Sequence, residues 1–342
     1  MTTDADIVVV GGGPIGLAAS IEARLAGLSV VVVEHHSGSL DKACGEGLMP
    51  GALPLLARLG VDPPGMPILG VSYRQGSVRA DHRFASGPGR GVRRLALHNA
   101  LLSRAVSLGV QVVSERATSV TQDAAGVTVA GVRASWLLAS DGLHSTVRSE
   151  VGLTVPTNSR SRRFGLRQHF AIEPWSDLIE VHWAPRVEIY VTPVSALETG
   201  IAVLGPRGTQ FADALASVPE IAARLRGAEP SSSLRGAGPF RQRASAPHAG
   251  RVLLVGDASG YVDAITGEGL RLGFAQARAA VASVAAGHPE SYDAEWRRIT
   301  RDFRRLTGAL VGAAQSPARR MIVPAARALP GLYGAVVEKL AE

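Results

Sequence analysis

The sequence of 342 residues contains a single cysteine, Cys44, and few aromatic residues. One cysteine permits no intramolecular disulfide and excludes a cysteine-based metal cage. The nine histidines show no spacing typical of a metal site, so we expect no metal. Aromatic residues make up 5% of the chain, which argues against a surface that stacks single-stranded bases. We therefore expect no nucleic-acid partner.

No apolar run in the sequence is long enough to span a bilayer. Residues 7–21 carry no charge, but glycines and Pro14 interrupt them, and the run is shorter than the ~20 residues that a membrane helix needs. The first six residues contain acids and lack the basic start and apolar middle of a secretory signal. These features predict a cytoplasmic protein.

The chain is basic, with a net charge of +7. This charge is compatible with an anionic partner such as a nucleotide or a phospholipid, although an Arg- and Ala-rich composition alone also explains it. In the tail, basic pairs lie at helical spacing beside apolar residues: Arg297-Arg298, Arg304-Arg305, Leu306, Leu310 and Val311. Such a stripe can hold a helix against an anionic membrane, but we favour a helix packed on its own domain.

A glycine-rich turn near the start carries the strongest signal. Gly11-x-Gly13-x-x-Gly16 lies between an apolar, β-branched strand over residues 6–10 and a helix over residues 15–26. In this context the first glycine permits a tight turn, the second lets a pyrophosphate approach the backbone, and the third lets helix and strand pack closely. The free N–H groups at the helix start then face the phosphates.

A second buried strand, over residues 29–33, ends at Glu34. Glu34 lies close to the ~20-residue offset expected for the acid that accepts hydrogen bonds from ribose hydroxyls. Strand, glycine turn, helix and acid together predict a dinucleotide-binding βαβ unit. The motif alone does not distinguish FAD from NAD.

The remaining chain changes character several times. Helical patterns cover residues 53–59, 94–108 and 270–286, and short alternating strands lie within residues 70–83. Successive strands with polar breaks between residues 164 and 204 indicate an antiparallel sheet. Residues 227–238 are predicted as a loop, residues 252–255 as a buried strand, and residues 293–340 as helices broken by Pro317, Pro324 and Pro330.

Two later segments follow the glycine motif in order: Asp141-Gly142 within ASDGLHSTVR, and Gly256-Asp257 within RVLLVGDASGYVDAITGEG. With these three motifs, residues 6–286 resemble the FAD-dependent family that includes para-hydroxybenzoate-hydroxylase-type monooxygenases and geranylgeranyl reductases. The resemblance implies FAD as the bound cofactor. It also implies NADH or NADPH as a transient reductant, because no second glycine-rich βαβ unit is present to hold it.

The resemblance assigns roles to individual residues. It implies that Asp257 contacts the ribityl and pyrophosphate side of FAD and that Arg94 reaches the phosphates. It also implies that the segment from Gly267 to Leu270 starts a helix facing the flavin N1–C2=O edge, where a helix N-terminus stabilises negative charge. The expected cofactor-binding residues are Gly11, Gly13, Pro14, Ile15, Gly16, Glu34, His35, Cys44, Arg94, Asp141, Gly142, Asp257, Gly267, Gly269 and Leu270.

Residues 42–48, with the sequence KACGEGL, resemble the cysteine-containing segment that lines the flavin in the reductase branch. The chain departs from that branch at Ala264, where proline is usual, and in its modest length. It departs from hydroxylases in having Ser259-Gly260 where a histidine is more common. Cys44 is therefore a candidate for the flavin surroundings, more as a small packed residue than as a redox thiol.

Residues 188–193 resemble the family strand that crosses the flavin face and ends in proline. Tyr190 and Pro193 are thus candidates for the wall of a substrate cavity, and an ordinary strand end explains them equally well. His169, His182 and Trp183 lie on neighbouring predicted strands and are further cavity candidates. No catalytic side chain is assigned.

We therefore expect an α/β fold in which a Rossmann-like FAD-binding domain is interleaved with an antiparallel-sheet substrate domain and followed by a helical C-terminal tail. The expected bounds are residues 1–69, 93–150 and 246–290 for the FAD-binding domain, 70–92 and 151–245 for the substrate domain, and 291–342 for the C-terminal helices.

The function favoured by the resemblance is an NAD(P)H-using monooxygenase that acts through a flavin C4a-hydroperoxide on an aromatic or lipophilic small molecule. A geranylgeranyl-reductase-like enzyme that saturates isoprenoid double bonds is the alternative. A flavin-dependent halogenase is disfavoured because its Trp-x-Trp-x-Ile-Pro motif is absent. A flavin-binding protein without turnover is the candidate from another class. The oligomeric state is not predicted.

Overall fold

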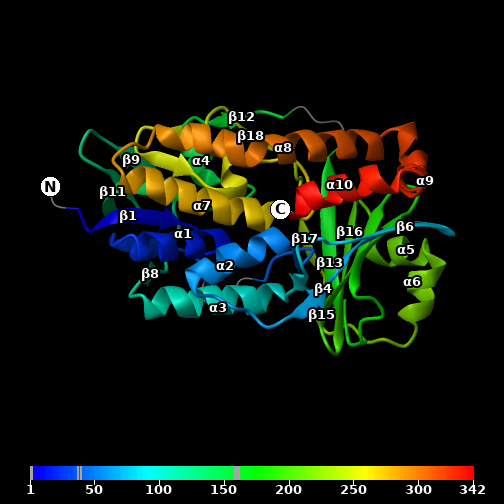
Figure 1. The fold of residues 1–342 in the computed structure, drawn as a ribbon. Helices are drawn as coiled ribbons and strands as arrows, with labels where there is room; N and C mark the ends of the chain where they lie inside the picture. Colours follow the sequence, from blue (N-terminus) through cyan, green and yellow to red (C-terminus); the bar gives the residue numbers. More distant parts are fainter. Residues whose placement is uncertain (1–2, 37, 39–40, 158–161) are drawn as a thin grey trace.

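The computed structural model describes residues 3–36, 38, 41–157 and 162–342. Two sheets lie side by side, as Figure 1 shows, with the helices of the N-terminal half around one sheet and the C-terminal helices extending from the first sheet to the second. The predicted α/β class, with an antiparallel-rich second sheet and a helical tail, is confirmed.

The first sheet begins with the predicted βαβ unit: β1 (Ala5–Val10), α1 (Pro14–Leu25) and β2 (Val30–Val33). The strands pair in parallel and consist almost wholly of buried β-branched residues, as expected for strands covered on both faces. The sheet order is β19-β20-β11-β1-β2-β8; β10 also pairs with β11, and β9 pairs with β10. Its later strands are β8 (Gln111–Val113), β9 (Val120–Gln122), β10 (Val127–Val129), β11 (Val132–Ala139), β19 (His248–Ala249) and β20 (Val252–Leu254).

The strand order brings three distant motifs to one edge of this sheet. β11 pairs in parallel with β1, and β20 pairs in parallel with β11. Parallel neighbours end at the same edge, which is where ligands bind in such sheets. The turn after β1 carries Gly11, the turn after β11 carries Asp141, and the turn after β20 carries Asp257.

Helices cover the first sheet and fix its turns. α1 packs against α7 so closely that a Cβ on Gly273 would lie 2.4 Å from Ile15 Cδ1. Tyr292 of α8 donates to the Leu254 carbonyl at the end of β20, at 2.8 Å. The helices of this half are η1 (Pro50–Ala52), α2 (Leu53–Leu59), α3 (Arg94–Ser107), α4 (Thr146–Glu150), η2 (Gly256–Ser259), α7 (Gly269–Ala285) and α8 (Ser291–Ala314).

The second sheet has seven strands in the order β17-β13-β16-β15-β14-β5-β6. Its neighbours are antiparallel except for β14 and β5, which are parallel. The strands are β5 (Gly70–Gln75), β6 (Val78–Arg83), β13 (Arg163–Phe170), β14 (Leu178–Trp183), β15 (Glu188–Ser195), β16 (Glu198–Pro206) and β17 (Arg235–Ala237). The short strand β17 ends the segment that was predicted as a loop.

Two helices that the sequence did not predict, α5 (Phe211–Ala216) and α6 (Pro219–Arg224), cover one face of this sheet. Two smaller three-stranded sheets complete the fold, one against β15 of the second sheet and the other against η2 of the first half. They comprise β3 (Gly47–Leu48), β4 (Met66–Ile68) and β7 (Gly89–Gly91), and β12 (Thr154–Val155), β18 (Gln242–Ala244) and β21 (Gly260–Tyr261).

The tail continues as η3 (Pro317–Met321), α9 (Ile322–Ala328) and α10 (Pro330–Ala341), which pack on β5 and β6. Pro317 and Pro330 start new helices, as predicted. Pro324 instead lies in the first turn of α9, where a missing N–H costs nothing. Among the described residues, no helix combines the length and apolar character needed to cross a bilayer. The domain bounds given above stay a prediction.

Candidate functional site

The glycine turn after β1 is shaped by contacts that exclude side chains. Gly11 has a φ of +104°, and a Cβ there would lie 2.5 Å from the Ser140 carbonyl oxygen. A Cβ on Gly16 would lie 1.8 Å from the Gly11 carbonyl oxygen. A Cβ on Gly13, in contrast, would meet nothing within 4 Å. Gly13 therefore borders open space at the start of α1, where the motif places a pyrophosphate.

Glu34 closes the same turn. Its carboxylate accepts from the Gly12 N–H at 2.7 Å and from the His36 N–H at 2.9 Å. Burial opposes ionisation of Glu34, but these hydrogen bonds outweigh it and lower the pKa of the carboxyl. His35 and His36 also place ring nitrogens 3.2 and 3.1 Å from Glu34 Oε1. The predicted ribose acceptor is thus ionised and held at the end of β2.

Asp257 lies in η2, and its carboxyl forms no hydrogen bond within the described part of the chain. Burial raises the pKa of Asp257 to about 6, while the charges of Arg94 and Lys42 act in the opposite direction. Arg94 begins α3, and its Nε is buried without a partner among the described residues. An acceptor and a donor that the protein leaves unsatisfied at this edge fit a polar ligand such as FAD.

The Asp141-Gly142 turn has the same character. Asp141 Oδ2 accepts from the Val147 N–H at 3.0 Å, whereas Oδ1 is buried and unpartnered within the described part of the chain. Burial raises the pKa of Asp141. Gly142 has a φ of +82°, and a Cβ there would meet nothing within 4 Å.

Arg148 joins two of the motifs, and the sequence analysis missed it. Its guanidinium is buried and donates to the Ala258 carbonyl at 3.0 Å and to the Leu143 carbonyl at 3.2 Å. It therefore fixes the Asp141 turn to the η2 segment. Arg148 was visible within ASDGLHSTVR, but only its long-range partner reveals the role.

The segment from Gly267 to Leu270 leads into α7 as predicted. Gly267 has a φ of +72°, and Gly269 is the first helical residue. Between them, buried Glu268 forms an ion pair with Arg271 at 2.5 Å. Burial raises the pKa of Glu268 to about 7. Leu270 is partly buried against the main core.

The loop that carries Cys44 is held by Glu46. Glu46 has a left-handed φ of +59°, and its carboxylate accepts from the Arg94 N–H at 2.7 Å. The other carboxylate oxygen contacts His169 Nε2 on β13. Burial raises the pKa of the Cys44 thiol, so the thiol is neutral. Glu46 thus connects the Cys44 loop, the start of α3 and the second sheet.

The protonation of His169 follows from its partners. His169 is fully buried, and its Nδ1 lies 3.1 Å from Arg167 Nη1 and 2.8 Å from Ser232 Oγ. Arginine can only donate, so Nδ1 accepts. Nε2 then carries the proton and donates to Glu46. In this structure His169 holds the Cys44 loop, and its ring reaches no open space.

Tyr190 and Trp183 lie on the face of the second sheet that points toward the α7 loop. Tyr190 donates to the Ile265 carbonyl at 2.7 Å, and both residues belong to the cluster that contains Ile265. Pro193 follows on β15. Its carbonyl oxygen lies close to Gly91, because a Cβ on Gly91 would lie 1.7 Å from that oxygen. Tyr190 and Trp183 therefore lie on the face nearest the α7 loop, whereas Pro193, three residues beyond Tyr190 on β15, turns its side chain to the other face.

His182 does not share that face. β14 pairs Val181 with Tyr190 and His182 with Ile189, and successive strand residues point to opposite faces. His182 Nε2 contacts Glu180 at 2.9 Å, on the face covered by α5 and α6. The structure therefore separates His182 from Tyr190 and Trp183.

A buried ion network that the sequence analysis missed anchors the α7 loop. Arg163 donates to Asp263 at 2.9 Å and to Glu188 at 2.5 Å. Arg319 of η3 reaches the other oxygen of Glu188. The loop, the second sheet and the C-terminal tail are thereby joined through one carboxylate.

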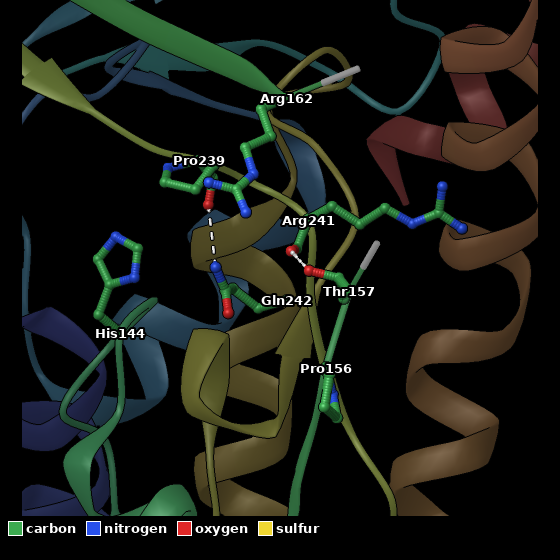
Figure 2. A pocket seen from close by; sticks show the side chains of 7 residues that line it. All are labelled: His144, Pro156, Thr157, Arg162, Pro239, Arg241 and Gln242. Atoms are coloured by element: carbon green, nitrogen blue, oxygen red, sulfur yellow. Dashed lines mark hydrogen bonds between the residues drawn. The ribbon is translucent and has the colours of Figure 1, made fainter. Parts of the chain in front are cut away.

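Figure 2 shows a recess with a volume of about 420 Å³. It opens two residues beyond Gly142, at His144; the Arg162 side chain extends toward Pro239 and Gln242, whereas the Arg241 side chain points away from them. None of its lining residues belongs to the predicted cofactor set. It is lined by His144, Pro156, Thr157, Arg162, Pro239, Arg241 and Gln242.

Comparison with known proteins identifies the class. The family model described as an FAD-binding domain matches residues 4–291, and the chain belongs to this family. It is an FAD-dependent oxidoreductase.

Among curated relatives, menaquinone reductase of Mycolicibacterium smegmatis is 28% identical, with 88% of this chain and 81% of that protein covered. Para-nitrophenol 4-monooxygenase of Pseudomonas is 27% identical, with 79% and 75% covered.

Among solved structures, a flavoprotein/dehydrogenase from Cytophaga hutchinsonii matches with a TM-score of 0.85 and 19% identity, covering 98% of this chain and 92% of that chain. The anhydrotetracycline hydroxylase OxyS from Streptomyces rimosus matches with a TM-score of 0.76 and 23% identity, covering 98% and 75%. Identities at this level establish the shared fold.

Proposed function

We propose that the chain is an NAD(P)H-dependent monooxygenase that hydroxylates an aromatic or otherwise lipophilic small molecule. The observation that carries the proposal is the wall opposite the α7 loop. There Tyr190, Trp183 and Tyr261 lie in one apolar cluster with Ile265, two residues before Gly267. An aromatic wall beside the flavin edge suits a flat, apolar substrate.

Bound FAD supplies the redox chemistry, and the residues supply binding and exclusion of water. The Gly13 turn and the start of α1 would hold the pyrophosphate, with Arg94 beside it. Asp257 would bind the ribityl chain, and the N–H groups at the start of α7 would face the flavin. The unpartnered atoms of Arg94 and Asp141 and the open space at Gly13 support this assignment.

Relatives support the reaction class. Para-nitrophenol 4-monooxygenase aligns over three quarters of its length, and its name describes oxidation of a small phenol. Rifampicin monooxygenase and a tetracycline monooxygenase match over 44% of this chain. The proposal transfers this class to the present chain, with the substrate left as an aromatic or lipophilic molecule.

The second candidate is a reductase acting on an isoprenoid or quinone. Its support is the loop from Lys42 to Leu48, in which the Cys44 sulfur accepts from the Glu46 N–H and Glu46 in turn binds the start of α3. The relative that covers 88% of this chain is a menaquinone reductase. In that case reduced flavin would saturate a double bond, and oxygen would not enter the product.

The deciding experiment uses FAD-loaded protein with NADH or NADPH and isotopically labelled O2. Candidate phenols and a short-chain polyprenyl quinone are supplied in separate reactions, and products are analysed by mass spectrometry. A labelled oxygen atom in the product establishes the monooxygenase. Gain of two hydrogens without label establishes the reductase, and overturns the first proposal. If none of the substrates stimulates NAD(P)H oxidation, the chain is a flavoprotein with neither monooxygenase nor reductase activity toward them.

A further inference from the structure

The C-terminal helices expose apolar side chains at one corner of the molecule. Met321, Leu329 and Leu332 have exposed fractions of 60%, 54% and 63%. They are three of the eight large apolar side chains exposed in the described part of the chain. Single exposed apolar residues are ordinary, but these three fall within residues 320–332. We call this region the C-terminal corner.

The three side chains lie on or beside two consecutive helices, α9 and α10. Met321 immediately precedes α9, and Leu329 immediately follows it. A helix of seven residues is about 10 Å long, and Leu332 lies in the first turn of α10. Figure 1 shows α9 and the start of α10 at the end of the molecule opposite the N-terminus.

The corner carries positive charge only. No acidic residue occurs between Asp302 and Glu338 in the sequence. Arg320 and Arg327, which flank Met321 and Leu329, are exposed. The acids of the underlying elements are paired: Glu338 contacts His82 at 2.6 Å, and Asp81 contacts Arg79 at 2.8 Å.

The basic stripe of α8 is a different surface. Leu310 and Val311 pack against the second-sheet cluster, and Arg304 stacks over Trp296 at 5.3 Å. As the sequence analysis favoured, this stripe belongs to a helix packed on its own domain. The exposed combination of apolar and basic side chains lies further along, at residues 320–332.

α10 connects the corner to the cofactor edge. It begins at Pro330 and ends against η1, where a Cβ on Gly51 would lie 2.0 Å from the Glu342 carbonyl oxygen. Met49, two residues before Gly51, lies near Gly267, because a Cβ on Gly267 would lie 3.5 Å from Met49 Cε. Twelve helical residues span about 18 Å. The apolar cluster beneath α10, with Tyr333 and Val337, continues to Ile265 and Tyr190.

We propose that the C-terminal corner rests on an anionic lipid surface. Met321, Leu329 and Leu332 enter the headgroup boundary, and Arg320 and Arg327 bind lipid phosphates, as in interfacial helices with apolar and basic faces. Contact is reversible and confined to the surface. This inference goes beyond the proposed reaction and holds for either chemistry, because binding to lipid is measured without turnover.

The test is co-sedimentation of the FAD-loaded full chain with vesicles. One set consists of phosphatidylcholine, and the other of phosphatidylcholine mixed with phosphatidylglycerol. We expect binding to the anionic vesicles that weakens as salt rises. The double variant L329S/L332S should lower the partition coefficient by about tenfold or more, since two apolar side chains leave the interface. The variant R320Q/R327Q should remove the preference for anionic lipid.

Matched controls lie elsewhere on the surface. Leu197, on the β15–β16 turn, is 68% exposed, and Arg226, after α6, is also exposed. L197S and R226Q should bind vesicles like the unaltered chain. The proposal is overturned if L197S or R226Q loses as much vesicle binding as the corner variants do. It is also overturned if the unaltered chain does not bind anionic vesicles. A dimer in solution that L329S/L332S dissociates without any vesicle binding overturns it as well, because the corner would then cover a second copy.

Discussion

His169 of β13 and Glu46 of the Cys44 loop form a hydrogen-bonded pair, with both side chains almost fully excluded from solvent. Glu46 also accepts from the N–H of Arg94. One carboxylate therefore joins the second sheet to the helix that carries the cofactor-edge arginine. A buried acceptor with two donors is costly to alter, because its removal leaves both donors unsatisfied.

Replacing Glu46 by glutamine should weaken FAD binding by about tenfold or more. The amide can accept from only one of the two donors and presents an N–H to the other, a loss of roughly 1–3 kcal/mol. FAD affinity is measured by flavin fluorescence, together with the visible flavin spectrum. E198Q is the control, because Glu198 pairs with neighbouring Arg93 at a more exposed position. Equal FAD affinity in E46Q and E198Q would contradict the role of Glu46.

Gly13→Val should give a folded protein that does not retain FAD. A Cβ at position 13 would meet no protein atom within 4 Å, and the valine side chain would occupy the space assigned to the pyrophosphate. Gly11→Ala should instead lower the melting temperature, because Gly11 has a positive φ and its Cβ would contact Ser140. Calorimetry and flavin absorbance separate the two effects. A fully flavinated G13V protein would refute the placement.

Asp257→Asn should stabilise the FAD-free protein at neutral pH while abolishing FAD binding. The folded-state pKa of Asp257 is raised from 3.8 to about 6 by burial. The folded state thus retains a proton that the unfolded chain releases, and the contribution of this group to stability falls as pH rises from about 4 to about 6.

The D257N substitution removes this pH-dependent loss of stability, so the variant should be more stable than the unaltered protein by roughly 3 kcal/mol above pH 6. Urea unfolding of both FAD-free proteins at several pH values measures the difference. No divergence between pH 4 and pH 6 would show that the Asp257 carboxyl ionises freely.

Tyr190→Phe should raise KM for the substrate severalfold with a smaller change in kcat. The lost hydroxyl no longer fixes the Ile265 carbonyl, so the wall and the α7 loop become less ordered. Tyr333→Phe is the matched control, since its hydroxyl binds the Val71 carbonyl at 3.2 Å in the same cluster. A KM that changes alike in both variants would assign the effect to general packing.

The local motifs were predictable because each depends on neighbouring residues. The helices α1, α2, α3 and α7 and the glycine turn follow from apolar periodicity and from glycine conformation. α5 and α6 were missed because six-residue helices carry too little periodicity to identify. The separation of His182 from Trp183 required the strand register, which decides the face that each side chain occupies.

The residues that connect the parts of the site could not be predicted from the sequence. Arg148 binds the Ala258 carbonyl across 110 residues, and Arg319 binds Glu188 across 131. Glu46 was visible within KACGEGL, but nothing local pointed to His169. Roles of this kind depend on contacts between distant segments, which neither composition nor spacing encodes.

The strand order of the first sheet has a consequence during synthesis. β20 pairs with β11, which pairs with β1, so the edge that faces the cofactor lacks Asp257 until the ribosome has added more than two thirds of the chain. A nascent fragment that ends before β20 holds the glycine turn but only part of the FAD surroundings. Capture of FAD is therefore a late event, and truncated chains should emerge colourless.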